Sequence, residues 1–114
     1  MNEPTSDLLR ELDAILAERR GQCPESSYVA SLYAKGVGGI ARKVGEEATE
    51  TIIAAMSNRR DELVKETADL WFHSLVLLAS AGLDSRDVLA ELARRQGISG
   101  HDEKRARKAN KPDE

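Results

Sequence analysis

The sequence predicts an all-α protein, a helical bundle built on an antiparallel pair of long acidic helices. Apolar residues repeat every three or four positions in several segments, and no alternating apolar pattern is long enough for a strand. Two acidic pairs at helical spacing, Glu47/Glu50 and Glu66/Asp69, fall among mostly apolar residues. With 114 residues and 40% hydrophobic content, the chain is long enough to form one domain over residues 1–114.

The first helix is expected near the N-terminus, where Ser6 or Asp7 can cap it and Gly21 marks its end. Its apolar residues repeat at spacings of three and four: Leu8, Leu9, Leu12, Ile15 and Leu16. This spacing predicts that one face of the helix packs inward.

A turn around Pro24 is followed by a second, short helix that Ser26 or Ser27 can cap. The apolar residues of this helix are Tyr28, Val29, Leu32 and Tyr33. The glycines of residues 35–39 predict a flexible connector, and a long helix is expected over 40–56.

The second long helix is predicted over residues 61–81, after a polar turn, and Gly82 stops it. Asp84 or Ser85 can cap the last helix. The residues of that helix expected to face the core are Val88, Leu89 and Leu92. The segment after residue 96 is polar and basic, and its end, from about residue 105, is predicted to be disordered.

Winding the second long helix at 3.6 residues per turn places Glu66 and Asp69 within its buried face. The apolar stripe beside them consists of Leu63, Leu70 and Leu77. On the first long helix, Glu47 lies at the margin of an apolar arc, and Glu46 and Glu50 come next to it. A buried carboxylate needs a counter-charge, so four acids together indicate a divalent metal ion and, with it, a phosphate-bearing substrate.

The two acidic pairs are expected to lie at similar heights along the two helices. Residues 51–65 separate Glu50 from Glu66, which is enough chain to finish one helix, turn and climb the next. His73, one turn after Asp69, is either a metal ligand or a core histidine bonded to a backbone carbonyl, and the second interpretation is favoured.

Composition excludes several other classes of protein. The net charge of −3, from 17 basic and 20 acidic residues, argues against nucleic-acid binding by the whole domain. The single Cys23 permits no internal disulfide and fits a reducing compartment. No apolar stretch could span a bilayer, and the acidic N-terminus is unlike a signal peptide, so a cytoplasmic protein without a membrane partner is expected.

With these residues in place, the sequence resembles the phosphoribosyl-ATP pyrophosphohydrolase family, a branch of the MazG-like all-α nucleoside triphosphate pyrophosphohydrolases. The superfamily motif, E-x-x-E followed by E-x-x-D on the next helix, falls on Glu47, Glu50, Glu66 and Asp69. The branch is suggested by three runs in the chain: SSYVASLYAKGVGGIARKVGEEATETIIAA, ADLWFHSLVLL and ELARRQGISGHDEKRARK. Trp71 and Phe72 depart from the smaller apolar residue and the tyrosine expected there, and this variation affects packing only.

The resemblance implies hydrolysis of phosphoribosyl-ATP to phosphoribosyl-AMP and pyrophosphate, with Mg²⁺, or Mn²⁺ as a substitute, held by the four acids of the motif. Either Glu46 or Glu47 would activate water, and Lys35 and Lys43 are candidate phosphate contacts. Further candidate substrate contacts come late in the chain: Arg94, Ser99 and Lys104. The resemblance also implies a homodimer, which would cover the apolar girth of residues 70–79.

Three alternatives remain open. A house-cleaning pyrophosphatase acting on dUTP or dCTP would carry the same acid motif. A di-iron carboxylate bundle would require Glu-x-x-His on two helices, which the motif helices lack. A non-catalytic helical interaction module would be favoured if the acids were exposed and bound no metal.

Overall fold

The computed structural model describes residues 6–96, and this part of the chain is helical without strands, as predicted. Its elements are α1 (Ser6–Glu18), the 3₁₀ turn η1 (Pro24–Ser26), α2 (Tyr28–Ala34), α3 (Gly36–Met56), α4 (Arg60–Ser80) and α5 (Ser85–Arg95). None of the described helices is both long and apolar enough to cross a membrane.

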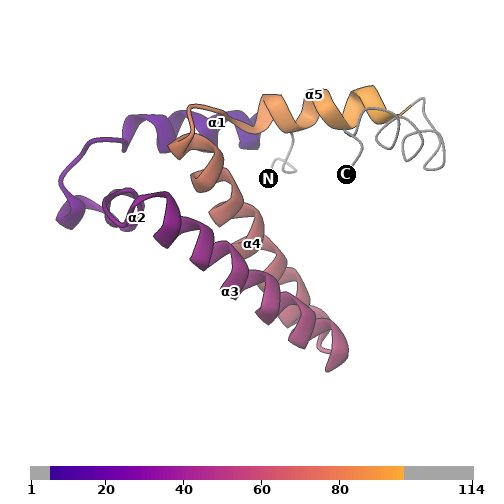
Figure 1. The fold of residues 1–114 in the computed structure, drawn as a ribbon. Helices are drawn as coiled ribbons and strands as arrows, with labels where there is room; N and C mark the ends of the chain where they lie inside the picture. The colour runs from indigo at the N-terminus through magenta and orange to yellow at the C-terminus, as the bar shows by residue number, and fades with distance from the viewer. Residues whose placement is uncertain (1–5, 97–114) are drawn as a thin grey trace, which may run out of the picture.

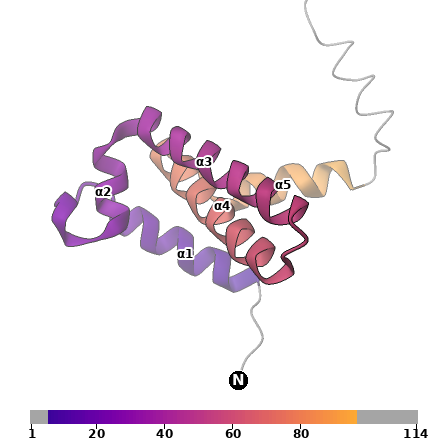
Figure 2. The ribbon, with the colours of Figure 1, turned by 90° about the horizontal axis from the view of Figure 1, so that it is seen from below.

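The two long helices, α3 and α4, form the predicted antiparallel pair (Figure 1). Helices α1, α2 and α5 gather at the end of the pair where α3 begins and α4 finishes, and the short turn between α3 and α4 lies at the far end. A view from below shows the pair nearer to the viewer than α1 and α5 (Figure 2). The pair therefore has one end covered by other helices and one end that projects.

The hydrophobic core lies at the covered end. Its four fully buried large side chains come from four different helices: Leu16 from α1, Leu32 from α2, Ile40 from α3 and Val76 from α4. Each helix thus contributes its apolar stripe to the same contact region, which fixes α1 and α2 against the long pair.

The junction of α2 and α3 differs from the prediction of a flexible glycine connector. Helix α3 begins at Gly36, and only this residue of the glycine run has a left-handed backbone, with φ of 75°. A single residue of that conformation turns the chain, and the following glycines continue as helix. A Cβ at Gly39 would lie 2.6 Å from the Cβ of Lys35, so the glycine permits the close approach of the two turns.

The starts of α2 and α5 follow the predicted caps. The hydroxyl of Ser27, not that of Ser26, accepts from the backbone N–H of Ala30 at 3.0 Å. Asp84 caps α5 in a reciprocal arrangement with Asp87.

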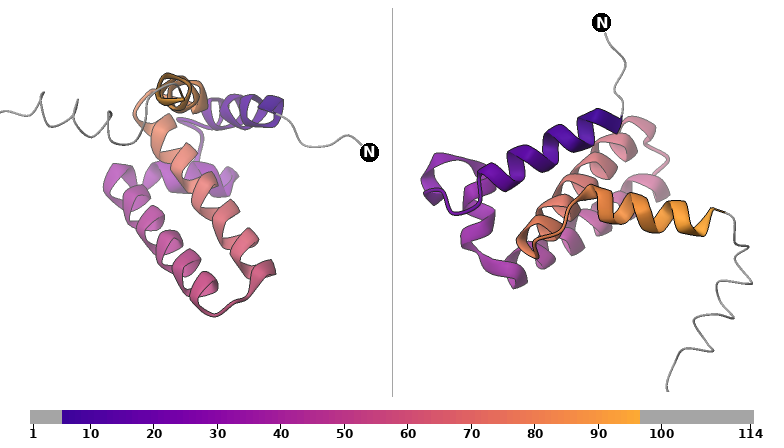
Figure 3. Two further views of the ribbon diagram at one scale, coloured as in Figure 1. Left: turned by 90° about the vertical axis from the view of Figure 1, so that its right-hand side faces the viewer. Right: turned by 90° about the horizontal axis from the view of Figure 1, so that it is seen from above.

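The prediction that the apolar residues of α5 face the core is wrong. Val88 and Leu89 are each 42% exposed and Leu92 is 55% exposed. Helix α5 starts where α4 finishes and lies on the same side of the long pair as α1 (Figure 3). Its apolar side chains line an open apolar groove with residues of α1 and α4. The other apolar residues of this groove are Leu9, Trp71, Leu75 and Leu78.

Candidate active site

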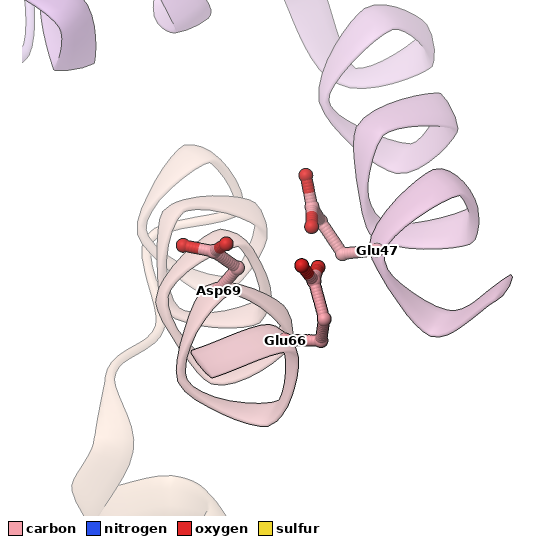
Figure 4. A group of neighbouring side chains, drawn as sticks. All are labelled: Glu47, Glu66 and Asp69. Atoms are coloured by element: carbon pink, nitrogen blue, oxygen red, sulfur yellow. The ribbon is translucent and has the colours of Figure 1, made fainter. Parts of the chain in front are cut away.

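The structure brings three of the predicted metal ligands together across the contact between α3 and α4. Glu47 of α3 and Glu66 and Asp69 of α4 each offer one carboxylate oxygen, and these oxygens all lie within 4.8 Å of one another. Figure 4 shows Glu47 of α3 and Glu66 of α4 with their carboxylates close together and Asp69 beside them on α4. We call this group the acid cluster.

The cluster follows from helix geometry. Glu66 and Asp69 are three residues apart and therefore share one face of α4. From Glu47 to the end of α3, and from the start of α4 to Asp69, the chain climbs similar distances of about 14 Å, at about 1.5 Å per residue. The short turn between the helices thus returns the acids of α4 to the level of Glu47.

Burial differs among the three acids. Glu47 is only 5% exposed and Glu66 is half-buried, but Asp69 is exposed, so the expectation that both acids of α4 lie within the buried face holds only for Glu66 in part. Asp69 thus lies at the solvent-exposed rim of the cluster. The cluster is therefore buried on the α3 side and open at Asp69.

Two carboxylate oxygens of the cluster lack a partner. Within the described part of the chain, Oε2 of Glu47 and Oε2 of Glu66 are buried and make no hydrogen bond. A buried carboxylate oxygen without a partner is costly, more so beside other negative charges. Oxygen donors arranged in this way suit a hard divalent cation.

One cation of the protein itself already reaches the cluster. Nζ of Lys43 lies 3.3 Å from Oε1 of Glu47 and 3.8 Å from Oε2 of Glu46. The hydrogen bond to Glu47 is the main cause that raises the pKa of Lys43, so this side chain is charged at neutral pH. Lys43 neutralises one oxygen of Glu47 and leaves the other without a partner.

Glu50, the fourth predicted ligand, lies beside the cluster but is not part of it. Its side chain is exposed, and its hydrogen bond with Glu66 is the first cause that raises the pKa of Glu66 to about 7. Burial and the negative charges of Glu50, Asp69 and Glu47 act in the same direction. Without a bound cation, Glu66 is therefore protonated in mildly acidic solution and loses its proton as the pH rises through about 7.

The remaining predicted site residues lie in different surroundings. Glu46 is exposed, pairs with Arg42 at 3.5 Å as well as with Lys43, and is not part of the acid cluster. Lys35 is exposed at the start of α3. Arg94 donates two hydrogen bonds to Glu91, at 2.7 and 3.0 Å, and with Arg95 lowers the pKa of that acid to about 2. Ser99 and Lys104, like the predicted disordered tail, lie outside the described residues.

His73 is a core histidine, as the favoured interpretation predicted. It is 4% exposed, and its Nδ1 lies 2.7 Å from the backbone oxygen of Asp69. Its Nε2 lies 2.7 Å from the hydroxyl of Tyr28. Both ring nitrogens are thus engaged, and the di-iron alternative finds no histidine in the acid cluster of the described chain.

Sequence reasoning missed Tyr28 as a neighbour of the site. The residue was expected only as an apolar member of the short helix, yet it reaches His73 from α2 and lies near Lys43. No spacing rule links positions 28, 43 and 73, because they lie on three helices whose packing brings them together.

Comparison with known proteins gives a consistent result. The family model described as phosphoribosyl-ATP pyrophosphohydrolase matches residues 9–96, which include the whole acid cluster. A protein of Hydrogenovibrio crunogenus named phosphoribosyl-ATP pyrophosphatase is 53% identical over 110 residues, covering 93% of this chain and 97% of its own length.

Two further proteins with the same name are similarly close. The one from Methylococcus capsulatus is 55% identical over 102 residues, covering 90% of this chain and 97% of its own. The one from Azoarcus sp. strain BH72 is 55% identical over 102 residues, covering 90% of this chain and 95% of its own length. On this match, and with the acid motif in its expected place, the chain belongs to the phosphoribosyl-ATP pyrophosphohydrolase family.

Proposed function

We propose that this protein hydrolyses 1-(5-phosphoribosyl)-ATP to 1-(5-phosphoribosyl)-AMP and pyrophosphate, the second step of histidine biosynthesis. Membership of the family and the names of its relatives support the substrate. The observation that carries the chemistry is the pair of buried carboxylate oxygens without partners, on Glu47 and Glu66, two residues of the acid cluster.

The proposed cofactor is Mg²⁺, with Mn²⁺ as a possible substitute. Glu47, Glu66 and Asp69 would hold it, and Glu50 would join them from the edge of the cluster once its proton-sharing contact with Glu66 is lost. The donor set fits, because it consists only of carboxylate oxygens and leaves room for waters and substrate phosphates. When bound, the ion would polarise the phosphoanhydride and neutralise charge on the departing pyrophosphate.

The side chains around the cluster have separate proposed roles. Lys43 would contact a substrate phosphate, since its ammonium group is charged and already lies 3.3 Å from Glu47. Of the two candidates for accepting a proton from the attacking water, Glu47 is supported by its place in the cluster, whereas Glu46 faces Arg42. A contact from Lys35 to a substrate phosphate, and contacts from Arg94, Ser99 and Lys104 to the substrate, remain part of the proposal.

A substrate panel tests the function. Purified protein is incubated with phosphoribosyl-ATP, dUTP or dCTP in the presence of Mg²⁺, Mn²⁺ or a chelator, and released pyrophosphate is measured. We expect turnover of phosphoribosyl-ATP that the chelator abolishes. Equal or better turnover of dUTP or dCTP would favour the house-cleaning alternative, and absence of any metal-dependent turnover would favour the interaction module.

We also propose a cytoplasmic homodimer of single-domain subunits. The support for a dimer is exposed apolar surface: Trp71, which is not part of the core, is 63% exposed and Met56 is 83% exposed. The groove of α1, α4 and α5 adds further uncovered apolar side chains. Light scattering at micromolar concentration checks this proposal, and a monomeric mass would contradict it.

A further inference from the structure

Helix α2 brings an aromatic side chain to the acid site and anchors it there. The hydroxyl of Tyr28 lies 2.7 Å from Nε2 of His73, and Nδ1 of His73 lies 2.7 Å from the backbone oxygen of Asp69. Because a carbonyl oxygen only accepts, Nδ1 carries the hydrogen and donates. In the neutral ring, Nε2 then accepts from the tyrosine hydroxyl. Tyr28 is thus connected, through one buried side chain, to the backbone of a proposed metal ligand.

The ring of Tyr28 also packs against the rings of Phe72 and His73 but is not covered. It lies 6.5 Å from the ring of Phe72 at an interplanar angle of 20°, and the edge of His73 meets it at 5.8 Å and 83°. Even so, Tyr28 is 50% exposed. An aromatic ring already fixed in place loses little conformational entropy when a flat ligand stacks on it.

Through His73, Tyr28 is placed on the side of the acid cluster that lies toward α2. His73 follows Asp69 by four residues, about one helical turn or about 6 Å along α4. Toward the opposite end of the pair, residues 44–70 contain no aromatic side chain.

We propose that the ring of Tyr28 stacks on the purine base of the nucleotide substrate, with the phosphates at the acid cluster and the base directed toward α2. This inference rests on the proposed function, because it takes the substrate to be a purine nucleotide. It adds a base contact from α2 to a site otherwise built from α3 and α4.

The test measures kcat and KM for phosphoribosyl-ATP in the wild type and in Tyr28→Leu and Tyr28→Phe. The phenylalanine variant loses the hydroxyl and keeps the ring, and the leucine variant loses both. Tyr33→Phe is the matched control, since it removes the other tyrosine hydroxyl of α2, which donates to the backbone oxygen of Leu16 at 2.7 Å. Thermal melting and light scattering of each variant show whether the fold and the mass are kept.

For Tyr28→Leu we expect KM to rise about tenfold, which corresponds to roughly 1.4 kcal/mol, with kcat within about threefold of wild type. Tyr28→Phe should have a KM within about threefold of the wild-type value, and Tyr33→Phe should have the wild-type KM. An unchanged KM in Tyr28→Leu, equal defects in the leucine and phenylalanine variants, or a loss of kcat together with a lower melting temperature or a changed mass would overturn the inference. A wild type that does not turn over phosphoribosyl-ATP would instead reject the proposed function.

Discussion

Two carboxylate sites between helices differ in one respect that separates a structural role from a ligand-binding role. Between α1 and α5, the carboxylate of Asp13 accepts from the backbone N–H of Ser85 at 3.1 Å and from its hydroxyl at 2.5 Å. Between α3 and α4, Glu47 and Glu66 each keep a buried oxygen without a partner. Both sites lie at helix contacts, but only the second concentrates like charges around unpaired oxygens.

The difference indicates what each site does for the protein. Asp13 closes the N-terminal turn of α5 onto α1, and its oxygens are engaged within the chain, so the folded state is stabilised without a ligand. The acid cluster raises the free energy of the ligand-free protein through repulsion and burial, and a bound cation would lower it. Substitutions at the two sites should therefore change stability and turnover in opposite ways.

The largest expected effect is on turnover, in Asp69→Asn. Removing one charge from the proposed metal site should lower kcat by at least about 100-fold. Loss of a residue that only supports a metal ligand already lowers activity by about 10–100-fold, and loss of a ligand itself should cost more. The melting temperature should stay the same or rise, since repulsion is relieved. Glu62→Gln is a matched control on α4, where Glu62 pairs only loosely with Lys65, at 3.9 Å, outside the cluster. Wild-type turnover in Asp69→Asn would remove this residue from the site.

Magnesium should stabilise the protein through the acid cluster. At a Mg²⁺ concentration one hundred times Kd, binding to the folded state adds about 2.7 kcal/mol, or about 10 °C in Tm at about 4 °C per kcal/mol. Thermal melting with Mg²⁺ and with a chelator measures the shift. The Mg²⁺-induced rise in Tm should be mostly lost in Glu66→Gln and kept in Asp13→Ala. Equal shifts in both variants would place the ion elsewhere.

The reverse pattern is expected for Asp13→Ala. This substitution leaves the buried Ser85 without an acceptor for its hydroxyl and its N–H, which should lower the free energy of unfolding by about 1–3 kcal/mol. Turnover measured well below the melting temperature should stay close to wild type. Urea denaturation gives the stability, and a loss of kcat at unchanged stability would contradict the structural role of Asp13.

The smallest expected effect concerns pH. In the ion-free folded state the pKa of Glu66 is raised to about 7 from its usual 4.5, mainly by the hydrogen bond with Glu50 and by burial. The folded state then binds more protons than the unfolded state between these values, so stability contributed by protonated Glu66 is complete below about pH 4.5 and is lost as pH rises through 7.

Chemical denaturation at several pH values, without divalent metal, measures this slope. Glu66→Gln should flatten the slope between pH 4.5 and 7, because the titrating group is gone. Metal binding should show the complementary trend, with Mg²⁺ affinity falling below pH 7 as protons compete for Glu66. A slope that persists unchanged in Glu66→Gln would assign the titration to another group.

Much of the fold could be predicted because local patterns determine it. The two long helices, the caps at Ser27 and Asp84 and the stop at Gly82 all follow from apolar spacing and from residue types that favour helix ends. The glycine run after Lys35 was misread, since only one of its glycines uses the conformational freedom that the whole run suggests. Composition does not indicate which glycine turns the chain.

The candidate site could be predicted in part. Glu66 and Asp69 share a helix face by spacing alone, and the length of the connecting segment places Glu47 opposite them. Successive side chains on a helix differ in direction by about 100°, so the rotation of α3 about its own axis decides which of its acids face α4. Spacing alone does not show that Glu50 lies at the edge of the acid cluster and that Glu46 lies outside it.

The sequence by itself determined that the chain is helical, where the long helices lie, which acids form the motif and which family it belongs to, because these follow from periodicity, residue type and motif spacing along one chain. Tertiary structure alone decided that two carboxylate oxygens are left buried without partners, that Tyr28 reaches His73, and that the apolar stripe of α5 lines an open groove. These features depend on how separate helices rotate and cross, and a pattern within one helix carries no information about the side chains its neighbours place opposite it.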